Sequence, residues 1–93
     1  MPKFVVEREI LGIGAWSAGQ RQKAAEKSRA VLREMGLDIQ WLTSYVTDDH
    51  LYCVYIAPGP DLIKEHAARG GFPCDRIAEV RGMMDPTTAE ERS

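Results

Sequence analysis

The chain has 93 residues, which suffice for one domain that folds alone but leave little apolar surface to spare. Its 12 Lys and Arg residues against 14 Asp and Glu residues form no basic field, so nucleic-acid binding is disfavoured. No run approaches the roughly 18 consecutive apolar residues of a membrane span, and residues 1–6 are too short for a signal peptide. We therefore expect a cytoplasmic protein with no nucleic-acid or membrane partner.

The first strand is predicted over residues 3–11 (KFVVEREIL), whose alternation puts apolar side chains on one face. Its second half carries Glu7, Arg8 and Glu9, which is unusual if the strand is central in a sheet. Residues 12–15 (GIGA) follow and are interpreted as a loop. They lack the third glycine and the βαβ context of a nucleotide-binding fingerprint.

A long helix is predicted next. Ser17 followed by Gln20 has the spacing of a capping box, which marks a helix start. Small and apolar residues recur at helical spacing from Ala24 to Met35, and charged residues fill the rest of the surface. Gly36 then supplies the expected C-terminal stop.

Residues 38–58 (DIQWLTSYVTDDHLYCVYIAP) predict a β-hairpin with its turn at Asp48-Asp49. Both faces of this hairpin carry apolar side chains, whereas a sheet with one wet face alternates apolar with charged residues. Each face therefore needs a cover. The register that this turn predicts pairs Tyr45 with Tyr52, Thr43 with Val54, and Trp41 with Ile56.

The last elements are a second helix and a fourth strand. The helix is predicted from Pro60, which suits a first turn, to Gly70, with His66 on its apolar face. The strand is predicted over residues 76–83 (RIAEVRGM). Residues 85–93 (DPTTAEERS) are polar and predict a frayed tail.

The element order over residues 1–84 is therefore β-α-β-β-α-β, the ferredoxin-like α+β arrangement of a four-stranded antiparallel sheet. Right-handed crossovers put the first and third strands in the centre, with spatial order 4-1-3-2. Two helices cover only one face of such a sheet. The second face is too apolar for a monomer, so we predict a homodimer with packed sheets, a dimeric α+β barrel that can enclose a pocket.

Three stretches resemble a known family: residues 1–9 (MPKFVVERE), 44–58 (SYVTDDHLYCVYIAP) and 65–80 (EHAARGGFPCDRIAEV). They are similar to a family of small bacterial proteins of unknown function. A characterised relative in that family is described as a nickel-binding protein with a dimeric ferredoxin-like α+β barrel. The resemblance, which covers residues 1–85, implies this fold, a homodimer and nickel as the bound ion, although relatives of this architecture differ in what they bind.

Three residues are candidate metal ligands: His66, Cys53 and Glu9. His66 faces the sheet, where it is either a core histidine held by one hydrogen bond or a ligand or proton carrier. Cys53 lies mid-strand and is either a small buried apolar residue or a thiolate ligand for nickel, zinc or copper. Neither Cys53 nor the second cysteine, Cys74, has a neighbouring His at ligand spacing, so a site must form in three dimensions or across the dimer. His50, in the turn, is interpreted as exposed and incidental.

The second cysteine, Cys74, follows a proline near the end of a loop. It forms no CxxC motif with Cys53, and reduced thiols are the default in a cytosolic protein. A disulfide between the two stays open, because the sequence gives no distance between their Cα atoms.

The charges on the central strand are a stronger signal of a functional site than the separate histidine and cysteines, because buried charges must be paired, solvated or lining a cavity. One reading pairs Glu9 with Arg81 of the fourth strand. The other lets these charges reach a polar pocket walled by aromatic residues, which otherwise are core or dimer contacts. The residues predicted to line such a pocket are Trp41, Tyr45, Tyr55, Glu7, Glu79 and Arg81.

Three functions stay open. The first is a dimeric metal-binding protein, with nickel favoured by the resemblance. The second is a small-molecule pocket with monooxygenase- or isomerase-like activity, by analogy with other dimeric α+β barrels. The third is a structural or partner-binding dimer module. The sequence carries no Ser-His-Asp order, paired metal motif or cofactor fingerprint, so it predicts no organic cofactor and favours a role other than catalysis.

Overall fold

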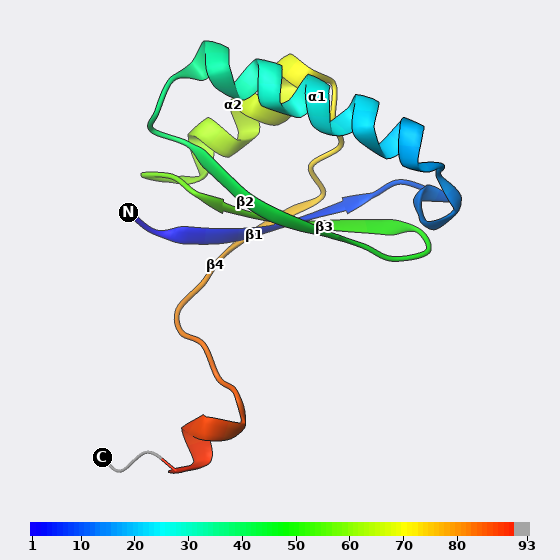
Figure 1. The fold of residues 1–93 in the computed structure, drawn as a ribbon. Coiled ribbons are helices and arrows are strands. Elements are labelled where there is room, and N and C mark those ends of the chain that lie inside the picture. Colours follow the sequence, from blue (N-terminus) through cyan, green and yellow to red (C-terminus); the bar gives the residue numbers. More distant parts are fainter. Residues whose placement is uncertain (91–93) are drawn as a thin grey trace.

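The computed structural model describes residues 1–90, and Figure 1 shows a two-layer α+β fold. Both α-helices lie on one face of a four-stranded antiparallel sheet. No helix within these 90 residues has the length and apolar character needed to cross a membrane. The elements are β1 (Lys3–Glu9), η1 (Ile13–Ala15), α1 (Ala18–Met35), β2 (Gln40–Val46), β3 (His50–Ile56), α2 (Pro60–Gly70), β4 (Arg76–Glu79) and η2 (Pro86–Glu90).

The sheet has the order β2-β3-β1-β4, which confirms the predicted order 4-1-3-2 and the ferredoxin-like topology. β1 is central and pairs with both β3 and β4. β4 is shorter than the predicted strand 76–83, because β1 begins at Lys3 and leaves nothing further to pair with. The last contact is the Val80 amide, which donates to the Lys3 carbonyl at 2.8 Å. β1 itself ends at Glu9 rather than at Leu11.

The hairpin of β2 and β3 contains an irregularity that the alternation pattern does not reveal. The predicted pairs of Tyr45 with Tyr52 and Thr43 with Val54 are confirmed. The predicted pair of Trp41 with Ile56 is wrong, because the register shifts between Trp41 and Thr43 and Trp41 pairs with Tyr55. One extra residue in β2 at this bulge moves the Trp41 side chain to the other face of the sheet. Trp41 therefore lies on the side that the helices cover.

The helix ends follow the local signals. The Ser17 hydroxyl accepts from the Gln20 amide at 3.1 Å, and the Gln20 side-chain oxygen accepts from the Ser17 amide at 2.9 Å, so the capping box is confirmed. α2 has Pro60 in its first turn and ends at Gly71, whose φ of 70° is left-handed. Left-handed backbone favours glycine because it has no Cβ.

The core lies between the sheet and the two helices. Side chains with even numbers on β1 and odd numbers on β3 face this layer, and Ile63 of α2 packs on them with no exposed surface. Three polar side chains are also buried, Arg8 at 2% exposure, Ser28 at 8% and His66 at 0%. The core cluster consists of Phe4, Val6, Ile39, Cys53, Tyr55, Ala57 and Ile63.

The other face of the sheet, here called the open face, carries no helix (Figure 1). At its centre Val5 of β1 lies between Val54 of β3 and Ala78 of β4. Tyr52 lies beside them on β3, and Tyr45 on β2 is 63% exposed. The open face thus has an apolar centre with charged and polar residues around it (Lys3, Glu7, Glu9, His50 and Arg76), and it has no cover within the part of the chain that the structure describes.

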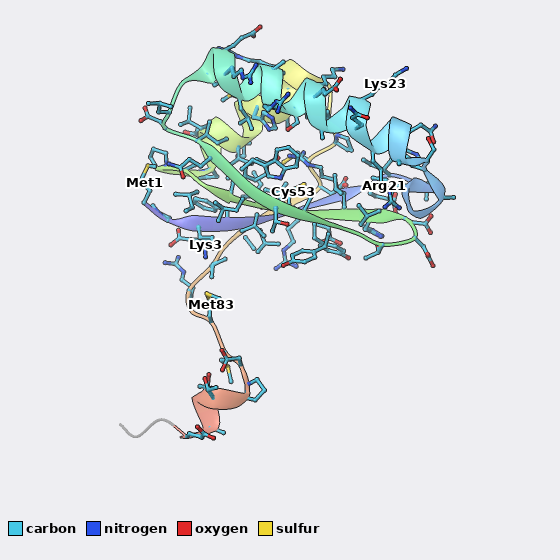
Figure 2. All side chains as sticks on the ribbon, viewed as in Figure 1. Met1, Lys3, Arg21, Lys23, Cys53 and Met83 are labelled. Atoms are coloured by element: carbon cyan, nitrogen blue, oxygen red, sulfur yellow. The ribbon has the colours of Figure 1, made fainter. Side chains whose placement is uncertain are left out.

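The chain beyond β4 forms an arm, defined as residues 80–90. It runs away from the sheet on the side opposite the helices and ends in η2 (Figure 1). Met83 and Met84 on it are 80% and 87% exposed, and Figure 2 shows Met83 far from the helices. The Asp85 carboxylate accepts from the Thr87 amide at 2.8 Å at the start of η2. Residues 91–93 of the predicted tail lie outside the described residues.

Candidate functional site

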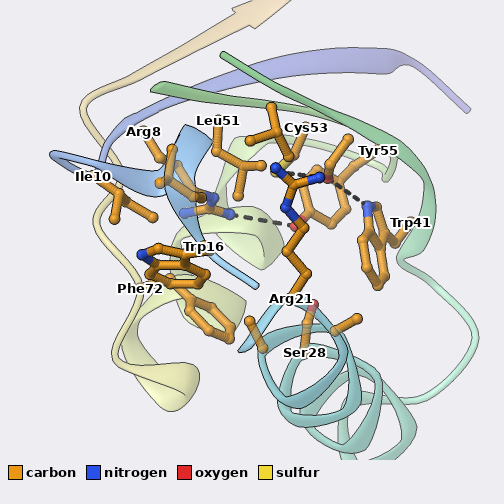
Figure 3. A pocket seen from close by; sticks show the side chains of 15 residues that line it. Arg8, Ile10, Trp16, Arg21, Ser28, Trp41, Leu51, Cys53, Tyr55 and Phe72 are labelled. Carbon is orange, nitrogen blue, oxygen red and sulfur yellow. Dashed lines mark hydrogen bonds between the residues drawn. The ribbon is translucent and has the colours of Figure 1, made fainter. Parts of the chain in front are cut away.

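A cavity of about 220 Å³ lies between α1 and the sheet (Figure 3). Its wall comes from β1, β2, β3, the first half of α1, and the loops before α1 and after α2. The apolar lining residues are Ile10, Ile13, Trp16, Ala24, Ala25, Trp41, Val46, Leu51 and Phe72. The polar lining residues are Arg8, Arg21, Ser28, Ser44, Cys53 and Tyr55.

Arg8 is the only lining charge that is buried. Its guanidinium donates to the Pro73 carbonyl and, at 3.3 Å, to the Tyr55 hydroxyl, and it lies 5.8 Å from the centre of the Phe72 ring. No carboxylate in residues 1–90 forms an ion pair with it. The structure therefore holds a buried cation whose partners are neutral, an arrangement that is expensive unless an anion compensates it.

Arg8 and Tyr55 both have raised pKa values. Burial opposes the charge on Arg8, but its interactions with Tyr55 and Cys53 outweigh burial and raise the pKa of Arg8 above its ordinary value. Burial, followed by the neighbouring Cys53, raises the pKa of Tyr55 to about 12 despite the adjacent guanidinium. At neutral pH the site thus contains a guanidinium cation beside a neutral phenol.

The sheet wall of the cavity carries a short chain of hydrogen bonds. The Trp41 ring nitrogen donates to the Ser44 hydroxyl at 2.9 Å, and that hydroxyl donates to the Cys53 sulfur at 3.0 Å. The bulge in β2 is what brings Trp41 to Ser44, since both then face the helices. Cys53 and Cys74 are both free thiols in the structure, so they form no disulfide.

His66 lies behind the cavity rather than in its wall. Its Nε2 is 3.2 Å from the Ser28 hydroxyl and 3.4 Å from the Ser28 carbonyl oxygen. Its ring centre is 5.5 Å from the ring centres of both Tyr55 and Phe72. Its Nδ1 is buried and has no hydrogen-bond partner within residues 1–90. This environment agrees with the interpretation of His66 as a core histidine.

His66 makes folding sensitive to pH. Burial lowers the pKa of His66 and the nearby Arg8 charge lowers it further, although the Ser28 backbone opposes both. The unfolded chain takes up a proton at His66 near pH 6.5, whereas the folded protein does so only at lower pH. We expect stability to be complete above about pH 6.5 and to fall as the pH drops through that value.

Urea unfolding from about pH 5 to pH 8 measures this dependence. The His66→Gln variant is expected to lose most of the decline, while His50→Gln, which changes a half-buried histidine on the open face, keeps it. Parallel pH profiles for the wild type and His66→Gln would contradict the assignment.

The structure does not bring the three predicted metal ligands together. His66 and Cys53 lie on the helix side of the sheet, and the His66 Nε2 is already engaged by Ser28. Glu9 ends β1 and shares the open face with Glu7. In the described residues, no three His, Cys, Asp or Glu side chains stand ready as a metal-holding group.

The predicted pocket residues separate into two groups. Trp41 and Tyr55 line the cavity, whereas Tyr45 and Glu7 lie on the open face, on the other side of the sheet. The bulge in β2 separates Trp41 from Tyr45, and alternation places Glu7 of β1 and Tyr55 of β3 on opposite faces.

Glu79 and Arg81 lie at the end of β4, away from the cavity wall. The Arg81 Nη1 is 2.9 Å from the Glu79 Oε2, and this pair is exposed. The predicted pair of Glu9 with Arg81 is therefore wrong. β1 and β4 run antiparallel, so the end of β4 lies beside the start of β1, far along the strand from Glu9.

His50 has a different environment from the one predicted for it. It begins β3 instead of lying in the turn, and it is half-buried. Its Nε2 is 3.9 Å from both the Glu7 Oε1 and the Glu9 Oε2, and its ring stacks on Tyr52 with 6.0 Å between centres. One imidazole and two carboxylates are donors that suit nickel. These three residues are called the open-face donor set below.

Sequence reasoning named Arg8 only as one of the charges on the central strand and His50 only as an incidental residue, and it did not propose Trp16 or Arg21 as lining residues. A signal for Arg8 was present, because alternation places it on the same strand face as buried apolar residues. For His50 the signal is the cross-strand pairing of β1 with β3, which is known only once the turn position and the strand ends are set.

The comparisons with known proteins agree with this fold. The family described as "Nickel responsive protein SCO4226-like" matches residues 4–80. The crystal structure of SCO4226 from Streptomyces coelicolor A3(2) is similar, with a TM-score of 0.74 and 18% sequence identity over 88% of this chain and 99% of that chain. At this identity the structural likeness shows the fold. Among curated proteins, none matches this chain.

Proposed function

We propose that this chain, which belongs to the family of nickel responsive SCO4226-like proteins, binds Ni²⁺ as a homodimer through the open face of its sheet. The observation that carries the proposal is the position of His50 between Glu7 and Glu9 on that face. The description of the family as nickel responsive supports the choice of ion, and the position of His50 beside two carboxylates supports the choice of donors.

A second copy of the chain is the occupant that suits the open face. The face is apolar at its centre, and a large exposed apolar patch marks an interaction site. The arm leaves the sheet on the same side and exposes Met83 and Met84, which suits an element that packs on a neighbouring chain. Two copies related by a two-fold axis would bury both faces and both arms at once.

The open-face donor set has donor types that nickel accepts, but its side chains would have to move closer together to hold an ion, because the described residues contain no preformed metal-holding group. Imidazole nitrogen is a common nickel ligand, and tetragonal nitrogen and oxygen sites suit Ni²⁺. The side chains of His50 and Glu7 are 33% and 37% exposed, so solvent ions can reach them. In a homodimer the set occurs twice, and each set lies at the end of a face that the second copy covers.

Isothermal titration of tag-free protein with NiCl₂ tests the proposal. The wild type is expected to bind, and His50→Ala is expected to bind at least about tenfold more weakly, because the variant loses the only nitrogen donor of the set. His66→Gln and Cys53→Ser, which change the sequence-derived ligands on the other face, are matched controls and are expected to bind like the wild type.

Two results would contradict this account. No binding by the wild type removes the nickel function. Wild-type affinity in His50→Ala together with loss in His66→Gln or Cys53→Ser removes the open-face donor set.

A further inference from the structure

We propose that the cavity between α1 and the sheet binds a small organic anion, a carboxylate carried on one flat apolar ring, with Arg8 as its charge partner. This inference goes beyond the proposed nickel function. The cavity lies on the helix side of the sheet and shares no residue with the open-face donor set.

The buried charge of Arg8 has no ion-pair partner among residues 1–90. Arg8 is 2% exposed, and its guanidinium donates to a carbonyl and a phenol oxygen and also interacts with the Cys53 side chain. A guanidinium has five N–H donors, so up to two remain for a ligand. A carboxylate is the group that matches this planar fork, because it accepts two parallel hydrogen bonds and neutralises the charge.

The charged residues in the cavity wall are both positive. Arg21 is the other charged residue in the wall, and within residues 1–90 no Asp or Glu lines the cavity. Arg21 donates to the Gly14 carbonyl at 3.2 Å, and Figure 3 shows both arginine side chains directed into the space between helix and sheet. A buried cation, Arg8, with the exposed Arg21 at the edge of the cavity favours an anion over a neutral or cationic molecule.

The size and shape of the cavity suit a small flat ligand. An apolar cavity of about 150 Å³ holds one benzene molecule, and typical drug-sized pockets measure about 300–1,000 Å³. The volume of about 220 Å³ therefore suits one ring with a short acidic arm. Trp16 and Trp41 offer flat aromatic walls, and aromatic rings pack well on such walls.

Small residues on α1 explain why the cavity is not filled by side chains. The residues of α1 that face the cavity after Arg21 are all small: Ala24, Ala25 and Ser28. Small residues at these positions leave a hollow that the flanking rings do not fill. A larger side chain in place of either alanine would occupy the volume that we assign to the ring.

Intrinsic fluorescence provides the test, because the chain has two tryptophans and both line the cavity. Phenylacetate, phenylacetamide and phenethylamine have the same ring and carry a negative, no and a positive charge. We expect saturable quenching or a spectral shift with phenylacetate, at least about tenfold weaker binding of the amide, and none of the amine.

Variants separate the two parts of the site. Ala25→Leu is expected to abolish phenylacetate binding by filling the cavity, while Ala30→Leu, at an exposed position of the same helix, leaves it unchanged. Arg8→Gln is expected to remove the preference for the acid over the amide. Because Arg8 is buried, circular dichroism first verifies that the variant folds, and Ala25→Leu tests the site without removing any hydrogen bond.

Three results would overturn the proposal: no response to phenylacetate up to about 10 mM, equal binding of the amide, or wild-type binding by Ala25→Leu. Each of these leaves the nickel titration unaffected, so failure here is distinguishable from failure of the nickel function.

Discussion

If the open face is the dimer interface that we propose, the Val54→Asp variant is expected to stay a monomer at concentrations where the wild type is expected to dimerise. Val54 lies at the centre of the open face, opposite Val5. In a two-fold dimer the variant would bury two unpaired carboxylates, one from each copy, and each costs several kcal/mol without a partner. The dissociation constant is therefore expected to rise by at least about 1,000-fold.

Sedimentation equilibrium at about 10 μM protein measures this effect. Leu37→Asp is the matched control. Leu37 is 91% exposed in the loop after α1, so this substitution adds the same charge away from the open face. It is expected to remain a dimer. A dimeric Val54→Asp protein, or a control that dissociates equally, would show that the open face is not the dimer interface.

The Ile63→Ala variant is expected to lose about 2–5 kcal/mol of unfolding free energy. Ile63 has no exposed surface and joins α2 to the core cluster on the sheet. Truncation leaves a cavity that the surrounding strands cannot fill, and the loss is a large part of the roughly 5–15 kcal/mol that stabilises a typical domain.

Urea unfolding at one fixed protein concentration measures the change, because assembly would otherwise alter the apparent stability. Leu62→Ala, next to it and only half-buried, is the control and is expected to lose clearly less. Equal losses in the two variants would contradict the assignment of Ile63 as the main contact of α2.

The fold could be predicted because its signals are local. The capping box of Ser17 and Gln20, Pro60 at a first turn, and Gly71 at a helix end each determine the backbone within a few residues. The alternation of the strands then leaves few topologies that satisfy the handedness of crossover connections. The bulge at Trp41 could not be predicted, because an extra residue in one strand is visible only against its partner strand.

The candidate site was harder to predict because its residues meet only in three dimensions. His66 and Cys53 were chosen for their chemistry, and the structure places both on the covered side of the sheet. His50 meets Glu7 through strand register. The alternation of β1 places Arg8 in the core, but the absence of an acidic partner among residues 1–90 depends on everything packed around it.

The two faces of the sheet therefore carry different chemistry. The covered face surrounds a cavity with a buried cation, and the open face carries an apolar centre with an imidazole and two carboxylates at its end. Because successive residues of a strand point to opposite faces of the sheet, a single substitution on a strand alters one face at a time. This separation is what makes the variants above informative.

Native mass spectrometry of the tag-free protein with Ni²⁺ tests the central claim most directly, because one spectrum reports both assembly and metal content. At a Ni²⁺ concentration that just saturates the wild type, we expect a species with the mass of two chains that carries one nickel ion per chain, and a His50→Ala dimer that carries clearly less nickel. A monomer, or a wild-type dimer that carries no nickel at saturating Ni²⁺, would contradict it.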